Sequence, residues 1–123
     1  MPRKLNDDRP IYLQLADEIR LRIVSGRCPA GERLPSVRDL AAEAAVNPNT
    51  MQRAMTELEA EGLVCAQRTA GRTVTEDAGR IRVTRDALAA AHAARFLEQM
   101  RSLGYAPAEA GEYLAAMIKE ETP

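Results

Sequence analysis

The chain of 123 residues lacks tryptophan, and only 3% of its residues are aromatic. This scarcity argues against an aromatic platform on which single-stranded nucleic acid would stack. The two cysteines, Cys28 and Cys65, are too few for a disulfide framework and predict a reducing, cytoplasmic location. Residues 1–4 lead directly into polar sequence, so we expect no secretory signal. No apolar run reaches the ~18–20 residues of a membrane span.

Groups that would support catalysis or metal binding are also scarce. His92 is the only histidine, and we find no paired carboxylates, nucleophile motif or metal-ligand spacing. The spacing of Gly26 and Gly31 resembles a phosphate-binding loop, but Glu32 and Arg33 follow where lysine and serine or threonine are required. We therefore interpret this segment as a turn. The sequence predicts no enzyme, no cofactor and no metal site.

The charge balance argues at first against a nucleic-acid partner, because the net charge is −1 whereas such domains are usually basic. The distribution along the chain changes this interpretation. Residues 44–56 contain no acid and a single arginine, and residues 62–75 contain no acid and the arginines Arg68 and Arg72. A protein that is neutral overall can therefore still present a local surface without negative charge.

Apolar periodicity predicts three helices in the first half of the chain, after a polar and flexible segment at residues 1–9. The first runs from Pro10 towards Gly26. The second begins at Ser36, a favourable N-cap with Asp39 three residues later. The apolar positions of these two helices are Tyr12, Leu15, Ile19, Ile23, Val37, Leu40, Ala41 and Ala44.

The third helix has the strongest start signal, because Asn47 is a favoured N-cap and Pro48 falls at the first helical position. Gly62 is expected to end it. Helical spacing predicts that one face, with Met51, Ala54, Met55 and Leu58, is buried. The opposite face carries Asn49, Gln52, Arg53 and Thr56.

Residues 63–67 and 73–75 are β-prone and flank a short connection with glycine, which predicts a hairpin. Two further amphipathic helices are expected, over about residues 83–103 and from Pro107. The predicted fold is mostly α with a small β-hairpin. The tight connection at residues 43–47 fits a helix-turn-helix, in which the N-terminal residues of the second helix contact base edges in the major groove.

In such a helix Asn49 and Gln52 can pair with adenine edges, and Arg53 can reach a guanine or a phosphate. The N–H groups at the starts of the second and third helices can hold phosphates. Arg68 and Arg72, predicted at the hairpin tip, can contact the DNA backbone or the minor groove.

Several spaced motifs resemble the winged helix-turn-helix of GntR-type bacterial transcription regulators. The matching segments are Pro10 to Tyr12, Gly31, Leu34 to Ala41, Val46 to Thr50, and Ala54 through Val64. The Val46–Thr50 segment and the short tail resemble the YtrA subfamily. The resemblance implies a winged helix-turn-helix domain at residues 10–76 and a helical dimerisation or effector-type tail at residues 77–123. The sequence departs from the family pattern at Pro48, where many members carry arginine, and at the wing residues 69–72.

The resemblance and the helix faces together predict double-stranded DNA as the partner. The candidate DNA-binding residues are Ser36, Arg38, Asn47, Pro48, Asn49, Thr50, Gln52, Arg53, Arg68, Gly71 and Arg72. One module makes few base contacts, each worth ~1–3 kcal/mol of discrimination, so two modules on a palindrome are expected. The candidate homodimer interface consists of Leu88, Ala91, Phe96, Met100, Leu103, Leu114, Met117 and Ile118.

The sequence therefore predicts a homodimeric repressor that binds a short inverted-repeat operator. The subfamily resemblance adds control of a transporter operon as an implication. The alternative is a winged-helix module for protein–protein interaction, and the tail helices could instead pack on the winged domain. A tail this short leaves little room for an effector cavity of ~300 Å³ except at a dimer interface, and the sequence names no effector.

Overall fold

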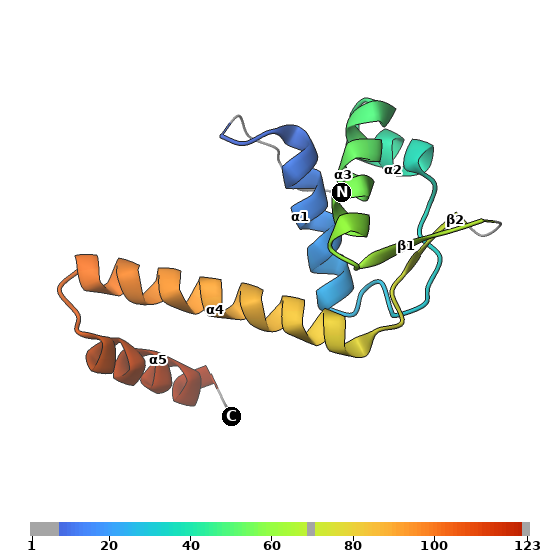
Figure 1. The fold of residues 1–123 in the computed structure, drawn as a ribbon. Helices are drawn as coiled ribbons and strands as arrows, with labels where there is room; N and C mark the ends of the chain where they lie inside the picture. The colour runs from blue at the N-terminus through green and yellow to red at the C-terminus, as the bar shows by residue number, and fades with distance from the viewer. Residues whose placement is uncertain (1–7, 69–70, 122–123) are drawn as a thin grey trace. The chain divides into compact units, whose positions relative to one another are not determined.

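The computed structural model describes residues 8–68 and 71–121, and its helices and strands follow the predicted order (Figure 1). The elements are α1 (Ile11–Val24), α2 (Val37–Ala44), α3 (Pro48–Ala60), β1 (Val64–Gln67), β2 (Gly71–Val74), α4 (Ala78–Ser102) and α5 (Pro107–Glu121). This confirms the predicted fold class, a mostly helical winged helix-turn-helix followed by two helices. The flexible segment predicted at residues 1–9 falls largely outside the described residues, as do the wing residues Thr69 and Ala70.

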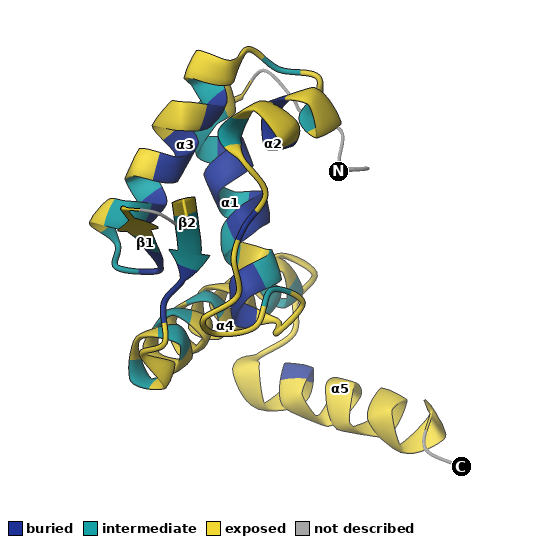
Figure 2. Ribbon diagram, turned by 90° about the vertical axis from the view of Figure 1, so that its right-hand side faces the viewer, coloured by how far each residue is buried: buried dark blue, intermediate teal, exposed yellow. Residues whose placement is uncertain are grey.

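The chain forms two compact units, Met1–Arg85 and Asp86–Pro123. In the first unit, α1 and α2 both pack against α3 and enclose one hydrophobic core (Figure 2). All four residues of the predicted apolar face of α3 are buried, which confirms that face. The core side chains are Leu15, Ile19, Ile23, Leu34, Leu40, Met51, Met55, Leu58, Leu63, Val64 and Val74, with Ala16, Ala41 and Ala54 between them.

Local hydrogen bonds fix the starts of α2 and α3 and the turn between the two helices. Ser36 Oγ accepts from the backbone N–H of Asp39 at 3.1 Å, and Asn47 Oδ1 accepts from that of Asn49 at 2.7 Å. These contacts confirm both predicted N-caps. Between the helices, Ala45 adopts a left-handed conformation with φ 56°, which is unfavourable for a residue with a Cβ atom. This conformation lets the N–H of Val46 bond to Ala41 O at 2.9 Å, and it sets the angle at which α3 leaves the turn.

The wing is an antiparallel pair in which Val64 lies opposite Val74 and Gln67 lies opposite Gly71. The segment before α2 lies along the other edge of β2, where the N–H of Leu34 donates to Arg72 O at 2.9 Å. β2 begins two residues before the predicted strand at 73–75. The prediction that Arg72 lies at the hairpin tip was wrong, because the pairing of β2 with β1 continues to Gly71 and places Arg72 opposite Ala66.

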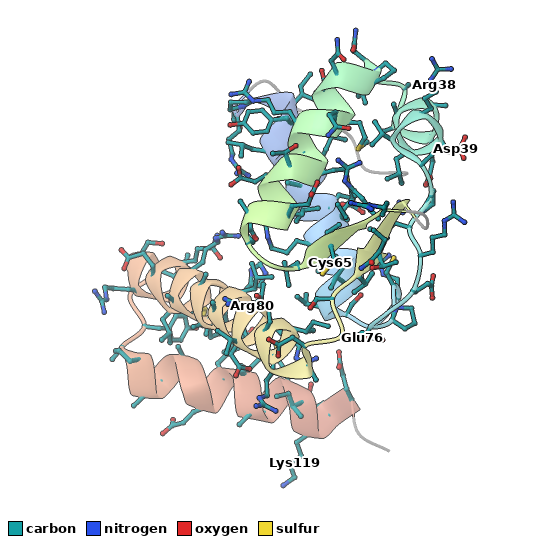
Figure 3. The ribbon with its side chains drawn as sticks, turned by 45° about the vertical axis from the view of Figure 1, so that its right-hand side comes forward. Arg38, Asp39, Cys65, Glu76, Arg80 and Lys119 are labelled. Carbon is teal, nitrogen blue, oxygen red and sulfur yellow. The ribbon has the colours of Figure 1, made fainter. Side chains whose placement is uncertain are left out.

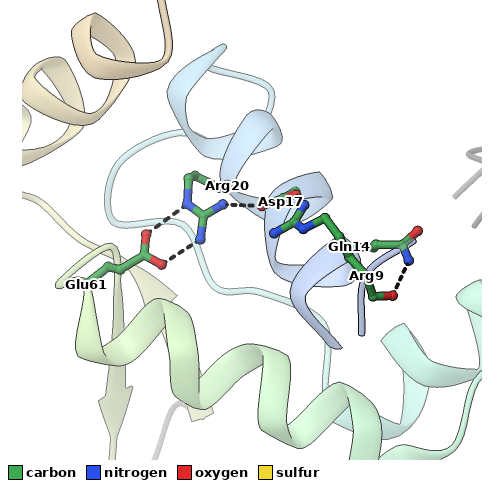
Figure 4. A network of polar contacts seen from close by, with 5 residues as sticks. All are labelled: Arg9, Gln14, Asp17, Arg20 and Glu61. Carbon is green, nitrogen blue, oxygen red and sulfur yellow. Dashed lines mark hydrogen bonds and ion pairs between the residues drawn. The ribbon is translucent and has the colours of Figure 1, made fainter. Parts of the chain in front are cut away.

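A polar network joins α1 to the end of α3 (Figure 4). Arg20 donates from Nε and Nη2 to the two carboxylate oxygens of Glu61 at 2.8 and 2.5 Å, and from Nη1 to Asp17 at 2.7 Å. Asp17 also pairs with Arg9. Partial burial raises the pKa of Asp17, but the hydrogen bonds from Arg9 and Arg20 outweigh this effect and hold the pKa below its ordinary value. The network fixes α1 relative to α3.

The helix expected at residues 83–103 begins earlier, at Ala78. Asp77 Oδ1 accepts from the N–H of Arg80 at 3.0 Å, Ile81 packs against the core, and Arg85 donates to Val24 O at 3.3 Å. These contacts tie the first turns of α4 to the winged unit.

In the second unit the rings of Tyr105 and Tyr113 meet edge to face at 5.9 Å between their centroids. Ala110 of α5 is buried. The last helix begins at Pro107, as predicted. No helix within the described residues is both long and apolar enough to span a membrane.

Candidate nucleic-acid interface

The face of α3 opposite the core is open in the winged unit. Asn49, Gln52, Arg53 and Thr56 are all exposed, as the helical spacing predicted. Pro48 is exposed as well, and Thr50 is half-buried. The oxygen of the Asn47 side chain is engaged by the cap, which leaves its amide N–H groups as donors. An exposed helix face of amides and a cation, with no acid among residues 44–56, suits base edges and phosphates.

The start of α2 and the wing share one cleft of about 790 Å³. Ser36, Gly71 and Arg72 all line this cleft, so the structure brings together candidates from the start of α2 and from β2. Arg38 does not line it and projects from the exposed side of α2 (Figure 3). Glu32 and Asp39 also line the cleft, so its charge is mixed.

The two wing arginines differ in their surroundings. Arg68 is exposed at the end of β1. The side chain of Arg72 is only 21% exposed, and its Nε donates to Glu59 Oε1 at 2.8 Å. Glu59 belongs to α3, so this ion pair fastens the wing to the helix. The sequence could not reveal the contact, because it depends on how the wing packs beside α3.

Arg53 is held by an aromatic ring instead of a carboxylate. Its guanidinium carbon lies 3.9 Å from the centroid of Tyr12, in the first turn of α1. Arg53, Tyr12, Asn49, Thr50, Pro10 and Ile11 line a hollow of about 440 Å³. The helical spacing placed Tyr12 on the apolar face of α1 and did not indicate its position beside α3. The available signal was an aromatic residue at the very start of the helix.

The candidate dimer residues lie mostly at the surface of the tail. Leu88, Phe96 and Met100 of α4 are half-buried and Ala91 is exposed. Leu103 is 73% exposed, and Leu114, Met117 and Ile118 of α5 are also exposed. Within the described residues of the second unit, only Ala110 is buried. The tail therefore presents several large apolar side chains that it does not cover itself.

The cysteines and acids of the described residues form no further site. No group of three or more histidine, cysteine, aspartate or glutamate side chains in residues 8–68 and 71–121 could hold a metal ion. Cys28 and Cys65 are half-buried and free, and burial raises the pKa of the Cys28 thiol, which disfavours the reactive thiolate.

A helix-turn-helix with an open second helix and an adjoining β-hairpin defines a winged-helix DNA-binding protein. Residues 11–74 match the family described as "Bacterial regulatory proteins, gntR family". The chain belongs to this family of transcriptional regulators, and neither its relatives nor its fold are those of an enzyme.

Two curated relatives align along most of the chain. The HTH-type transcriptional regulator YhcF of Bacillus subtilis (strain 168) is 38% identical over 104 residues, which is 85% of this chain and 86% of that protein. The HTH-type transcriptional regulator Rv1152 of Mycobacterium tuberculosis is 38% identical over 106 residues, which is 86% of this chain and 84% of that protein. The HTH-type transcriptional repressor YtrA of Bacillus subtilis is 39% identical over 69 residues, which is 56% of this chain and 53% of that protein. This similarity supports assignment of the chain to the YtrA-like subfamily.

Solved structures agree with the fold of the whole chain. A GntR family transcriptional regulator from Listeria monocytogenes is 36% identical and has a TM-score of 0.81, covering 94% of this chain and 98% of that one. YtrA from Sulfolobus acidocaldarius covers 100% of both chains at 24% identity and a TM-score of 0.56, which supports the fold alone.

Proposed function

We propose that the protein is a homodimeric repressor that recognises a short inverted repeat, with one α3 helix in the major groove of each half-site. The observation that carries this proposal is the exposed polar face of α3, which stands opposite a fully buried apolar face. A rigid helix with such a face fits the major groove of B-DNA, where base edges present donors and acceptors.

Base recognition is assigned to the side chains that leave α3 on its open side. Asn49 and Gln52 carry amides that can pair bidentately with adenine, and Arg53 carries donors for guanine or phosphate. Phosphate contacts that set the register are assigned to two further regions. Ser36 and Arg38 lie at the start of α2, and Arg68, Gly71 and Arg72 lie in the wing.

The dimer is proposed to form through the tails of two copies. Leu103, Leu114, Met117 and Ile118 expose apolar surface that a second copy would remove from water. Patches of this kind on small proteins often mark interaction surfaces. A two-fold dimer would also present two α3 helices to a two-fold operator.

Repression is proposed to occur by occlusion of a promoter. The relative YtrA of Bacillus subtilis is named a repressor, which supports this direction of control. A chromosomal operator requires a cytoplasmic protein, and the subfamily resemblance points to a transporter operon as the target. No effector is assigned.

The proposal is tested by selecting bound duplexes from a random-sequence pool with the purified full-length protein. We expect enrichment of an inverted repeat, and an affinity for it that falls steeply as salt concentration rises. Gln52→Ala should weaken binding to the enriched duplex about 5- to 150-fold for each half-site, since the bidentate pair lost there is worth ~1–3 kcal/mol. Lys119→Ala in α5, exposed and far along the chain from α3, is the matched control and should bind normally.

Two results would contradict the proposal. A pool that yields no enriched sequence, with weak binding to all duplexes, would favour the protein–protein module instead. Equal affinities of the wild type and Gln52→Ala would remove α3 from base recognition. Thermal unfolding of each variant checks that a loss of binding does not come from a loss of fold.

A further inference from the structure

Three arginines are anchored at α3, and they are anchored in two different ways. Arg20 donates to Glu61 and Arg72 donates to Glu59, so carboxylates at the C-terminal end of α3 occupy donors of both guanidinium groups. Arg53 instead lies over the ring of Tyr12 at 3.9 Å. Within the described residues, no ion pair links Arg53 to an acid.

The difference matters because of where a guanidinium carries its hydrogens. Its five N–H donors point outward in the plane of the group, whereas a cation–π contact uses the flat face. A carboxylate partner consumes donors, but an aromatic partner restrains the side chain and leaves the donors available. Arg53 is therefore held in place and is still able to bind an acceptor.

The ring that holds Arg53 is itself fixed. Tyr12 is half-buried and packs against the hydrophobic core of the winged unit. It lies in the first turn of α1, and α1 is joined to α3 by the bidentate contact between Arg20 and Glu61. The position of the ring relative to α3 is thus set by the fold.

The space beside the stack is open, with an apolar side and a polar side. Pro10, Ile11 and Tyr12 line one side of the hollow of about 440 Å³, and Arg53, Asn49 and Thr50 of α3 line the other. The three residues of α3 are already assigned to DNA contact, so an acceptor entering the hollow would meet Arg53 and the start of α3 together.

We infer that Tyr12 is a positioning residue for DNA recognition that acts through Arg53. The ring limits the rotamers of Arg53 before binding and directs its donors to an acceptor on the duplex, either a phosphate oxygen or a guanine edge. Less side-chain freedom then remains to be lost when the complex forms. This inference rests on the proposed function and adds to it a residue outside the helix-turn-helix.

The test is a double-mutant cycle on binding of the full-length protein to the duplex enriched by the wild type. Tyr12→Phe keeps the ring and should bind like the wild type. Tyr12→Leu keeps apolar volume without a ring and should weaken binding roughly two- to fivefold for each half-site. In an Arg53→Ala background, Tyr12→Leu should cause no further loss, because the residue through which Tyr12 acts is gone.

The acceptor is identified by the salt dependence and by repeating the selection. If Arg53 contacts a phosphate, Arg53→Ala and Tyr12→Leu will weaken binding to all duplexes, and Arg53→Ala will reduce the salt slope by about 2, one for each subunit of the proposed dimer. If Arg53 contacts guanine, both variants will relax the preference at one position of the enriched sequence. Either pattern supports the inference.

Several results would overturn it. They are a Tyr12→Leu variant that binds like the wild type, a Tyr12→Phe variant as weak as Tyr12→Leu, or losses that simply add in the double variant. Should Tyr12→Leu be unfolded at the assay temperature, Tyr12→Met takes its place in the same cycle. Failure of the wild type to enrich any duplex would instead reject the proposed function, so the two failures are distinguishable.

Discussion

The winged unit and the tail use their apolar residues in opposite ways. In the winged unit, side chains from α1, α2, α3 and the wing bury one another, and Met51, Met55 and Leu58 are fully inaccessible. In the described part of the tail only Ala110 is buried, while Leu103 is 73% exposed and Met117 is 49% exposed. Both regions contain amphipathic helices, so helical pattern alone does not distinguish them.

The difference shows how much the stability of a helix depends on the elements that cover its apolar face. α3 is covered by two helices and by β1, so its core face is complete within one chain. Most helical stability in proteins comes from such packing of an amphipathic face. The tail helices have no comparable cover within their own unit, which is why a second copy is the proposed partner.

The largest effect is expected from breaking the winged core. Leu58→Ala should lower the free energy of unfolding by about 2–5 kcal/mol, because it removes a fully buried side chain and leaves a cavity. Leu103→Ala in the tail should change it by less than about 0.5 kcal/mol. Urea unfolding of both variants at a low protein concentration measures the contrast. Equal losses would mean that the two regions do not differ as described.

A smaller effect, on dimer formation and not on folding, is expected when charged residues are introduced into the tail. Leu114→Glu combined with Met117→Glu should raise the dissociation constant of the dimer at least about tenfold, because charges would be buried without partners. Light scattering with chromatography at tens of micromolar protein measures the mass. Lys119→Glu alters the net charge by the same amount and should leave assembly unchanged. A wild-type monomer at this concentration would contradict the proposed dimer.

The smallest effect on the free energy of unfolding is expected from a change in the polar network between α1 and α3. Because Asp17 has a lowered pKa in the folded protein, its contribution is present above its unfolded value of about 3.9 and is lost as pH falls through the folded value. Asp17→Asn should therefore be less stable than the wild type at pH 7, and this difference should shrink below about pH 4. Urea unfolding at pH 7 and pH 3 tests this. A difference that does not depend on pH would exclude the charge of Asp17 as its cause.

The candidate site was predictable where it depended on one helix. N-cap chemistry at Asn47 and the spacing of Met51, Met55 and Leu58 were sufficient to orient α3 and to place Gln52 and Arg53 on its open face. The wing was harder to predict, because β1 pairs with β2 as far as Gly71, which places Arg72 in the strand. The segment at Glu32–Leu34 also bonds to β2 from its other side. Long-range pairing of this kind leaves no local periodicity to detect.

By itself, the amino-acid sequence determined the helices of the winged unit, their caps and the buried face of α3, because these follow from interactions among residues close in sequence. Its spaced motifs were sufficient to indicate the family. Only the tertiary structure decided which cations near α3 keep their donors available. The ion pair of Arg72 with Glu59 and the stack of Arg53 on Tyr12 join residues from separate elements. Such contacts exist only after those elements have packed around a common core, so their chemistry is a property of the packing.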